Sequence, residues 1–301
     1  MARQRRRSSR SVRRRRVAQA RVRLADHLAE RGFTDEAITH YERAVELEGH
    51  NADTRVKLGD AYFEAEMPRK AYQAYRKALN IHPRHAEAHF CLGEFLYNHG
   101  FVRHALAAME KAVACDPSRH YYACRLGDMY MFVSRLDDAR RLYEQAVGLE
   151  PQEGYYHYKL AELHMRTMDF AAAVSAYETA VRCSPVDDFY CARLGAAYVR
   201  EERFELALRS LERAAAIAPD NPVHRYAMAD VLILFADGQR AQEEVAGAGP
   251  LDEYALDGLR RWRSRSGVIP LMEAGMLPVY EAEIGPPGAA HFGFATPGEE
   301  L

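Results

Sequence analysis

The sequence lacks the features that mark membrane, exported or nucleotide-binding proteins. No run of about 18 apolar residues occurs, so we expect no membrane-spanning helix. The five cysteines are an odd number without a C-x-x-C pair, and no apolar stretch follows Arg16 as an export signal would require. We therefore expect reduced thiols and a cytoplasmic location. Glycine-rich phosphate loops and nucleophile elbows are also missing, so we predict no catalytic residue and no cofactor.

A metal site is not indicated either. His82, His85 and His89 lie close together in the sequence. However, Pro83 places the first two in a turn, and no fourth ligand is evident beside them. We predict that these histidines bind no metal.

Acidic residues are absent from the first 16 positions, which contain nine arginines. The rest of the chain has 32 basic and 43 acidic residues, a formal charge of −11. Residues 1–17 are too charged to be buried, so we predict a disordered arm. It could bind a polyanion such as nucleic acid or anionic lipid, contact the acidic remainder of the chain, or only add solubility. The candidate polyanion contacts are Arg5, Arg6, Arg7, Arg13, Arg14, Arg15 and Arg16.

What the sequence does contain is a pattern that recurs every 34 residues. Seven copies begin near residues 18, 52, 86, 120, 154, 188 and 222, and positions are numbered within each copy. The eighth position is always small: Ala25, Gly59, Gly93, Gly127, Ala161, Gly195 and Ala229. The twentieth is always alanine: Ala37, Ala71, Ala105, Ala139, Ala173, Ala207 and Ala241. Small residues at fixed positions predict close contact between two helices in each copy.

Larger residues and prolines complete the pattern. Position 24 is bulky: Tyr41, Tyr75, Met109, Tyr143, Tyr177, Leu211 and Val245. Five copies end on a proline, which lacks an N–H and stops the second helix: Pro83, Pro117, Pro151, Pro185 and Pro219.

Residues 18–250 resemble the tetratricopeptide repeat family, although the family's usual tryptophan at position four is absent from every copy. The resemblance implies an all-α fold, a right-handed α-solenoid of antiparallel helix pairs in which each pair is buried against its neighbours. Some members grip the C-terminal carboxylate of chaperones with paired Lys and Asn residues. That pair is missing here, so we expect no such binding.

The pattern weakens towards the C-terminus. Residues 236–238 should break the turn of the seventh copy, and Gly247, Gly249 and Pro250 should cut its second helix short. Residues 251–266 then predict a capping helix over the exposed end of the stack, anchored by Trp262. Residues 267–301 form a tail rich in proline and glycine, which could fold back.

In this family, positions two, five, nine, twelve and thirteen of the first helix line a concave groove. Position nine is acidic in six copies: Asp26, Asp60, Glu94, Asp128, Glu162 and Asp230. Position six is basic in five copies: Arg23, Lys57, Arg125, Lys159 and Arg193. These charges should pair along or between copies. They either form a mutually paired face or hold the polar groups of a bound peptide.

Between these charges, the groove positions of the middle copies are aromatic or methionine, as recognition surfaces often are. Tyr122, Tyr156 and Tyr190 lie one residue later and should pack against the preceding copy. The predicted groove for a partner comprises Phe90, Tyr97, Tyr121, Cys124, Arg125, Asp128, Met131, Tyr155, Tyr158, Lys159, Glu162, Met165, Phe189, Arg193 and Val199.

The predicted function is that of a non-enzymatic scaffold or adaptor that binds a peptide segment of a protein partner in the groove. Three alternatives stay open. The arginine-rich arm could tether an adaptor to nucleic acid or an anionic membrane, the chain could be an accessory subunit of a separate enzyme, or it could self-assemble through the solenoid ends. The sequence names no partner.

Overall fold

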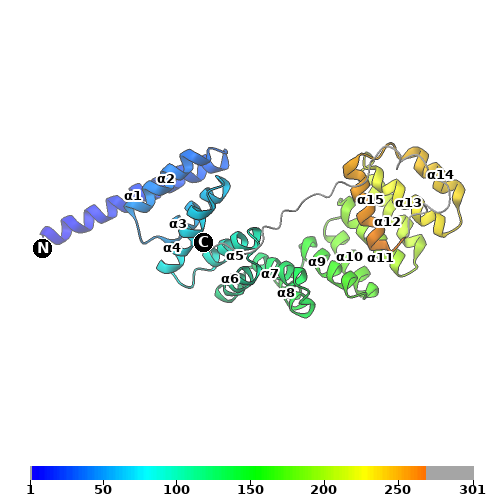
Figure 1. Ribbon diagram of the computed structural model, residues 1–301, viewed down its shortest axis with the longest axis horizontal. Helices are drawn as coiled ribbons and strands as arrows, with labels where there is room; N and C mark the ends of the chain where they lie inside the picture. The colour runs from blue at the N-terminus through cyan, green and yellow to red at the C-terminus, as the bar shows by residue number, and fades with distance from the viewer. Residues whose placement is uncertain (1, 269–301) are drawn as a thin grey trace. The chain divides into compact units, whose positions relative to one another are not determined.

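The computed structural model describes residues 2–268, with side chains from residue 12 onward, as fifteen helices and no strand. The chain divides into two compact units, residues 1–183 and 184–301 (Figure 1). Unit 1 contains the first five copies of the repeat and unit 2 the last two. Among the described residues, no helix has the length and apolar character needed to cross a membrane.

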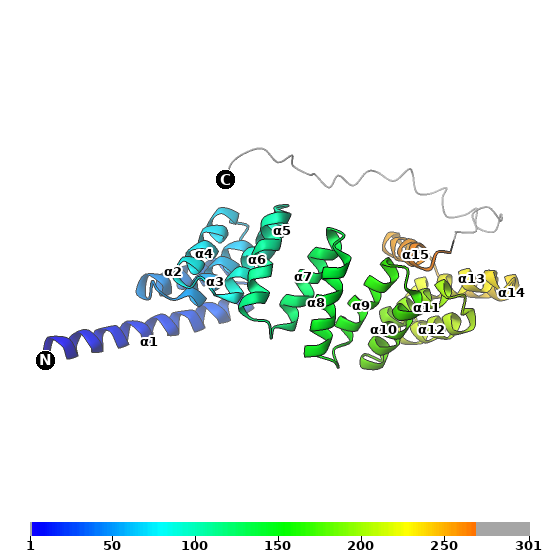
Figure 2. The same ribbon diagram turned by 90° about the horizontal axis from the view of Figure 1, so that it is seen from below.

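Unit 1 is a stack of five helix pairs, which Figure 2 shows as successive neighbours. The first helices of the pairs are α1 (Ala2–Glu30), α3 (Ala52–Glu64), α5 (Ala86–Asn98), α7 (His120–Phe132) and α9 (Gly154–Arg166). The second helices are α2 (Thr34–Leu47), α4 (Pro68–Ile81), α6 (Val102–Cys115), α8 (Leu136–Leu149) and α10 (Phe170–Cys183). Each second helix packs against its own first helix and, from α2 to α8, against the first helix of the next pair.

Unit 2 contains two further pairs and one additional helix. The pairs are α11 (Asp188–Arg200) with α12 (Phe204–Ile217), and α13 (Pro222–Leu234) with α14 (Gly238–Gly247). The additional helix is α15 (Glu253–Ser266). At 10 residues, α14 is shorter than the 14-residue second helices before it, as Gly247, Gly249 and Pro250 predicted.

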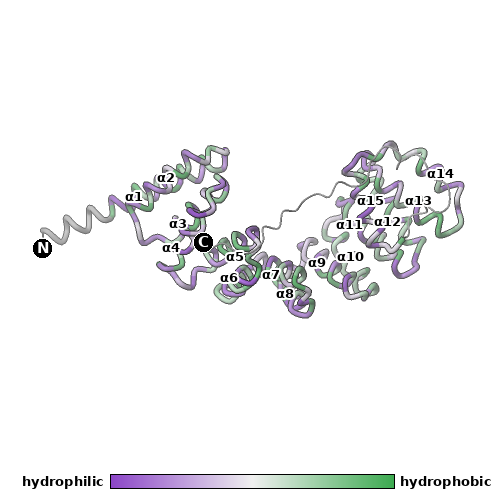
Figure 3. The backbone as a smooth tube through the Cα atoms, viewed as in Figure 1, coloured by the Kyte–Doolittle hydropathy of each residue, from purple (hydrophilic) through white to green (hydrophobic). Residues whose placement is uncertain are grey.

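Local signals explain where the helices begin. The first helices of several pairs are capped by the preceding side chain, as Asn51 accepts a hydrogen bond from the Thr54 amide and Asp187 from the Tyr190 amide. Figure 3 shows hydropathy alternating along the helices, the pattern of amphipathic helices that bury one face. The alanines at position twenty form that buried face, none of them more than 3% exposed.

Every turn between a first and a second helix contains a left-handed residue at position fifteen. Two of these residues are glycine and five are not: Gly32, Glu66, Gly100, Ser134, Met168, Glu202 and Ala236. The prediction that the turn of the seventh repeat is broken at residues 236–238 is therefore wrong, because Ala236 keeps the common geometry at φ 58°.

The small residues at position eight allow the two helices of a pair to touch. A Cβ atom added to Gly127 would lie 2.7 Å from the Cε1 atom of Tyr143, and one added to Gly59 would lie 2.5 Å from the same atom of Tyr75. Tyr143 is 2% exposed. The predicted close contact is confirmed, and the large residue at position 24 fills the space that position eight leaves.

α15 does not cover the end of the stack as predicted. After the first four pairs and the sixth, the next helix packs against the second helix of the preceding pair, whereas α15 packs against α11 and α13, both first helices (Figure 1). The shortened α14 offers little surface for a further stacked helix, and Gly249, at φ 66°, turns the chain away. Trp262 is buried as predicted, but in the helix that packs against α11 and α13 rather than over the end of the stack.

The N-terminal arm also differs from the expectation. α1 runs from Ala2 to Glu30, so the backbone of residues 2–17 is helical rather than disordered. Polar, arginine-rich sequences can still be helical because arginine has a high helix propensity. Of the predicted C-terminal tail, only Gly267 and Val268 lie within the described residues.

Candidate groove and its surroundings

Charged residues at positions six and nine are paired from one repeat to the next in unit 1. The Lys57 ammonium lies 2.8 Å from a carboxylate oxygen of Asp26, and the Lys159 ammonium lies 3.0 Å from Asp128. Between them along the stack, Arg125 lies 2.6 Å from Glu94. The predicted pairing is confirmed, and it joins position six of one repeat to position nine of the repeat before.

In four repeats, a tyrosine at position 24 donates a hydrogen bond to the carboxylate at position nine of the same repeat. The phenol of Tyr41 donates to Asp26 at 2.7 Å, and that of Tyr143 donates to Asp128 at 2.8 Å. The equivalent bonds are Tyr75 to Asp60 and Tyr177 to Glu162. Burial, and then the charge of Asp128, raise the pKa of Tyr143 well above its usual value.

Three of the predicted contact residues, Arg125, Asp128 and Lys159, therefore already join successive repeats, and a fourth, Glu162, accepts a hydrogen bond from Tyr177 within its own repeat. Burial tends to lower the pKa of Lys159, but the negative charge and hydrogen bond of Asp128 outweigh it, so the net pKa is raised and the side chain stays charged. Each partly exposed pair contributes roughly 0.2–1 kcal/mol. This arrangement favours the interpretation of a mutually paired face.

Beside the paired charges lies an aromatic surface, which we call the aromatic stripe. It consists of Tyr121 in α7 and of Tyr155 and Tyr158 in α9, with Met131 and Met165 further along the same helices. Tyr121 is 47% exposed. The rings of Tyr155 and Tyr158 are 6.2 Å apart, and the Lys159 ammonium lies 5.1 Å from the Tyr155 ring. Such amphipathic rings are typical of surfaces that bind other proteins.

Phe90 and Tyr97 border the aromatic stripe on α5. The Phe90 ring lies 5.4 Å from the Tyr121 ring and stacks on Tyr122 at 4.6 Å. Tyr97 makes an edge contact at 5.8 Å with Phe132, which is 61% exposed. Phe132 occupies position thirteen, a groove position outside the predicted set.

Cys124 does not belong to the surface. It has no exposed area, and burial raises the pKa of its thiol to about 12. With no exposed surface, this thiol cannot contact a partner in this conformation. Tyr122, Tyr156 and Tyr190 are buried, as expected of residues that pack between helices.

The other three predicted groove residues belong to unit 2. Phe189 is 42% exposed, and the Arg193 guanidinium lies 4.6 Å above its ring. Arg193 and Val199 are buried, at 8% and 6% exposure. Of these three predicted residues, therefore, only Phe189 presents substantial surface.

The histidines near the third repeat serve the local fold. The Nε2 atom of His85 lies 2.7 Å from Asp53, and that of His89 lies 2.9 Å from the carbonyl of Pro83. Burial lowers the pKa of His89. No group of three metal-binding side chains occurs in residues 2–268.

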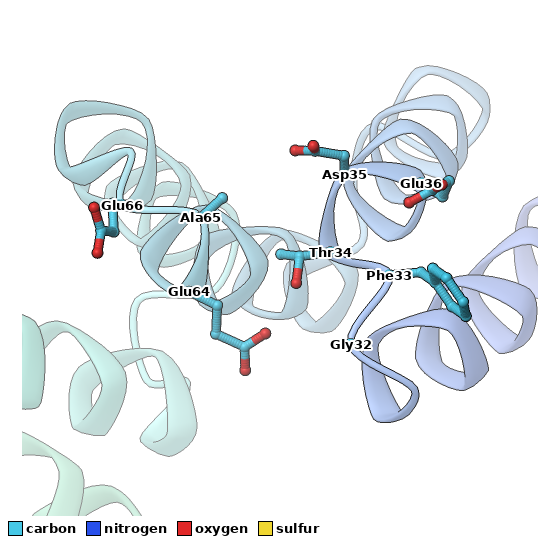
Figure 4. Close-up of a pocket in the computed structure, with 8 residues that line it drawn as sticks. All are labelled: Gly32, Phe33, Thr34, Asp35, Glu36, Glu64, Ala65 and Glu66. Atoms are coloured by element: carbon cyan, nitrogen blue, oxygen red, sulfur yellow. The ribbon is translucent and has the colours of Figure 1, made fainter.

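A surface pocket of about 420 Å³ lies between the α1–α2 turn and the α3–α4 turn (Figure 4). Its lining includes four carboxylates: Asp35, Glu36, Glu64 and Glu66. None of the predicted groove residues lines it. Sequence reasoning missed the pocket because it is built from two turns about one repeat apart, and each turn alone carries no signal of a cavity.

Family models described as tetratricopeptide repeat match residues 16–84, 56–120, 124–188 and 191–223, which together span most of the chain. The chain belongs to the tetratricopeptide repeat family. Tetratricopeptide repeats form α-helical scaffolds that bind other proteins, and the helix pairs of both units have the architecture of the family. No curated protein matches the sequence.

Solved structures of tetratricopeptide repeat proteins share the fold. The C-terminal part of a repeat-containing protein from Cytophaga hutchinsonii is 15% identical, with a TM-score of 0.64 over 79% of this chain and 99% of that one. PilF of Pseudomonas aeruginosa is 19% identical, with a TM-score of 0.60 over 77% and 99%. YrrB, described as a tetratricopeptide repeat protein with an unusual peptide-binding site, is 19% identical, with a TM-score of 0.54 over 62% and 96%.

Proposed function

We propose that unit 1 is a non-enzymatic scaffold that binds a peptide segment of another protein along the aromatic stripe. The observation that carries this proposal is the exposure of Tyr121, 47%, at a groove position of a helix whose neighbouring charges are already paired. The Tyr121 ring contacts Phe90 of the preceding repeat, yet nearly half of the side chain stays exposed. Burying this exposed aromatic surface against a partner is favourable.

The chemistry of the surface defines the partner. Because the charges beside it are already paired, the aromatic stripe selects apolar and aromatic side chains of a partner. The partly exposed Asp128–Lys159 pair can hydrogen-bond to polar backbone groups of that partner. Tyr121 and Tyr155 occupy the same position in successive repeats, so an extended segment or a short helix could contact both. The peptide-binding site in the name of YrrB is in keeping with this proposal.

The test replaces Tyr121 and Tyr155 with alanine in the full chain. We expect the double variant to lose capture of partners that the wild-type chain retains, because removing two central aromatic contacts typically costs about 2 kcal/mol or more each. The measurement is quantitative affinity capture, followed by the dissociation constant for each captured partner. An enzyme among those partners would indicate an accessory subunit.

Tyr254→Ala is the matched control, since Tyr254 is 82% exposed and lies outside the aromatic stripe. Circular dichroism of each variant establishes that the helices are retained. If the double variant binds every partner as tightly as the wild type does, the aromatic stripe is not the binding surface.

A second candidate function is attachment to a polyanion through α1. This helix has 29 residues, whereas the other first helices have 13, and its extra turns contain the arginine-rich segment. The side chains of residues 12–17 are exposed, and Arg15 lies 3.6 Å from Glu48 in an ion pair. Dense positive charge near a helix N-terminus opposes the helix dipole, so bound phosphate would stabilise this helix.

A further inference from the structure

α15 lies along the groove positions of α13. A Cβ atom added to Gly258 would lie 3.3 Å from Val223, at position two, and Leu259 shares an apolar cluster with Tyr226, at position five. Further along, the guanidinium of Arg263 donates two hydrogen bonds, of 2.7 and 2.9 Å, to Asp230 at position nine. Three groove positions in succession are thus covered by two successive turns of α15, residues 258–263.

The buried residues of α15 form a single stripe. Ala255, Leu259, Trp262 and Ser266 are 6% exposed or less, at spacings that place them on one face of a helix. Arg263 adjoins this stripe, whereas Tyr254, on another face, is 82% exposed. α15 therefore has the form of an amphipathic peptide whose apolar side faces α11 and α13.

Asp230 shows that α15 takes over a role that other repeats fill internally. In four repeats, the acid at position nine accepts a hydrogen bond from a tyrosine at position 24. The seventh repeat has Val245 there, which cannot donate. Arg263 supplies the donor instead, and the side chain of Asp230 is only 6% exposed.

Repeat six is adapted in a complementary way. Its position nine is Ala196, the one exception to the acidic pattern, and its position 24 is Leu211. Ala196 is 1% exposed on α11, so a carboxylate there would be buried without its usual tyrosine donor. In this region Asp230 of α13 is the carboxylate that α15 binds, through Arg263 beside its apolar stripe, whereas α11 has Ala196 at the equivalent position.

α15 is joined to the repeats as a separate segment. Asp252 caps its start by accepting a hydrogen bond from the Ala255 amide, and Gly267 ends it in the left-handed conformation, against Arg200. Only residues 248–252 connect it to α14. Within the described residues, the buried indole Nε1 of Trp262 has no hydrogen-bond partner, which weakens the docked state.

We infer that the first helices of repeats six and seven form a helix-binding surface that α15 occupies as an intramolecular ligand. The partner that fits this surface is an amphipathic helix of another protein that copies the stripe of α15. It would carry a bulky apolar residue, an aromatic residue three positions later, and an arginine directly after that. Such a helix binds by displacing α15.

This surface is independent of the aromatic stripe, which lies in unit 1. Loss of binding through Tyr121 and Tyr155 would leave α15 docked, and release of α15 would leave the aromatic stripe unchanged. Failure of either proposal is therefore distinguishable from failure of the other.

Trp262 is the only tryptophan of the chain, so its fluorescence reports the docking of α15 directly. The probe is a synthetic peptide of residues 251–268 carrying Trp262→Phe, titrated into the full chain. We expect the emission of Trp262 to shift to the red as the peptide displaces α15. Because a short tether gives the docked helix an effective concentration on the order of millimolar, millimolar peptide is needed for the wild-type chain.

A chain with Leu259→Ala holds α15 more weakly, so displacement should need at least roughly tenfold less peptide. A chain with Tyr254→Ala should behave as the wild type, because that residue is exposed. No red shift in either the wild-type or the Leu259→Ala chain at saturating peptide would overturn the inference. A dimer formed by exchange of α15 between two copies, seen by light scattering, would overturn the intramolecular assignment.

A charge exchange separates recognition from misfolding. A labelled peptide of residues 251–268 with Arg263→Glu should bind poorly to the Leu259→Ala chain, and tightly to a chain with Asp230→Arg, whose own Arg263 is repelled. A preference of the Arg263→Glu peptide for the Asp230→Arg chain over the Leu259→Ala chain, by an expected factor of ten or more, cannot come from a loss of structure. Equal binding of the labelled peptide to both chains would exclude the Asp230–Arg263 pair as a determinant.

Discussion

Tyr143 illustrates how single residues of this chain serve two purposes. Its ring fills the space beside Gly127, and its hydroxyl donates to Asp128, a carboxylate that also pairs with Lys159 of the next repeat. The tyrosine therefore connects the packing within a repeat to the charge pairing between repeats. Repeats without tyrosine at position 24 have other arrangements, as Asp230 and Ala196 show.

We expect Tyr143→Phe to lower the free energy of unfolding by about 1 kcal/mol, because Asp128 loses one buried donor but keeps Lys159. Denaturant unfolding measures the change. Tyr254→Phe, at an exposed site, should have no effect. In combination with Asp128→Asn, the effect of Tyr143→Phe should shrink; fully additive effects would show that the hydrogen bond is not the cause.

At the scale of the element, the turn between the two helices of a pair is the strained part of the repeat. Met168 takes a left-handed conformation at φ 61°, although its side chain is 66% exposed and gains little from packing. Gly100 takes the same place in the third repeat at φ 79° without strain. The repeat period, rather than the residue type, imposes this conformation.

Met168→Gly should therefore stabilise the chain by about 0.5 kcal/mol, since the relief of left-handed strain exceeds the added entropy of the unfolded state. Gly100→Ala should destabilise it by about 1 kcal/mol, through strain alone, because no atom lies within 4 Å of the added Cβ. Thermal unfolding of the two variants measures both changes. Destabilisation by Met168→Gly would show that its side chain packs more than its exposure implies.

At the scale of the whole molecule, charge is distributed very unevenly. Nine arginines lie within residues 1–16, and the rest of the chain has a formal charge of −11. The side chains of Arg13 to Arg16 are exposed on α1. This exposed basic helix at the N-terminus, attached to an acidic body, favours binding of phosphate groups through α1.

If α1 binds nucleic acid, affinity for a duplex of random sequence should fall steeply with salt and disappear when residues 2–16 are deleted. The helix signal in circular dichroism should also persist to higher temperature when the duplex is bound, since phosphate relieves the repulsion between arginines of the helical α1. Fluorescence anisotropy at several salt concentrations measures the affinity, and vesicles with anionic lipid serve as the second polyanion. Salt-independent binding, or binding that survives the deletion, would contradict this role.

Sequence alone determined the repeats of this protein, because helix pairing between neighbours depends on contacts that recur every 34 residues. Gly127, Tyr143 and the alanines at position twenty are readable without coordinates for that reason. The pairing of acids with bases was readable too, but not the tyrosine donors that bind the same carboxylates, since these act across two helices.

Only the tertiary structure decided where α15 lies. Its amphipathic stripe could pack against either the end of the stack or the groove face. The sequence favours the end, because solenoids are usually capped there. The choice depends on long-range contacts: Arg263 pairs with Asp230, 33 residues away, and the short α14 offers little surface for stacking. The burial of Cys124 and the exposure of Tyr121 were likewise decided by packing between repeats.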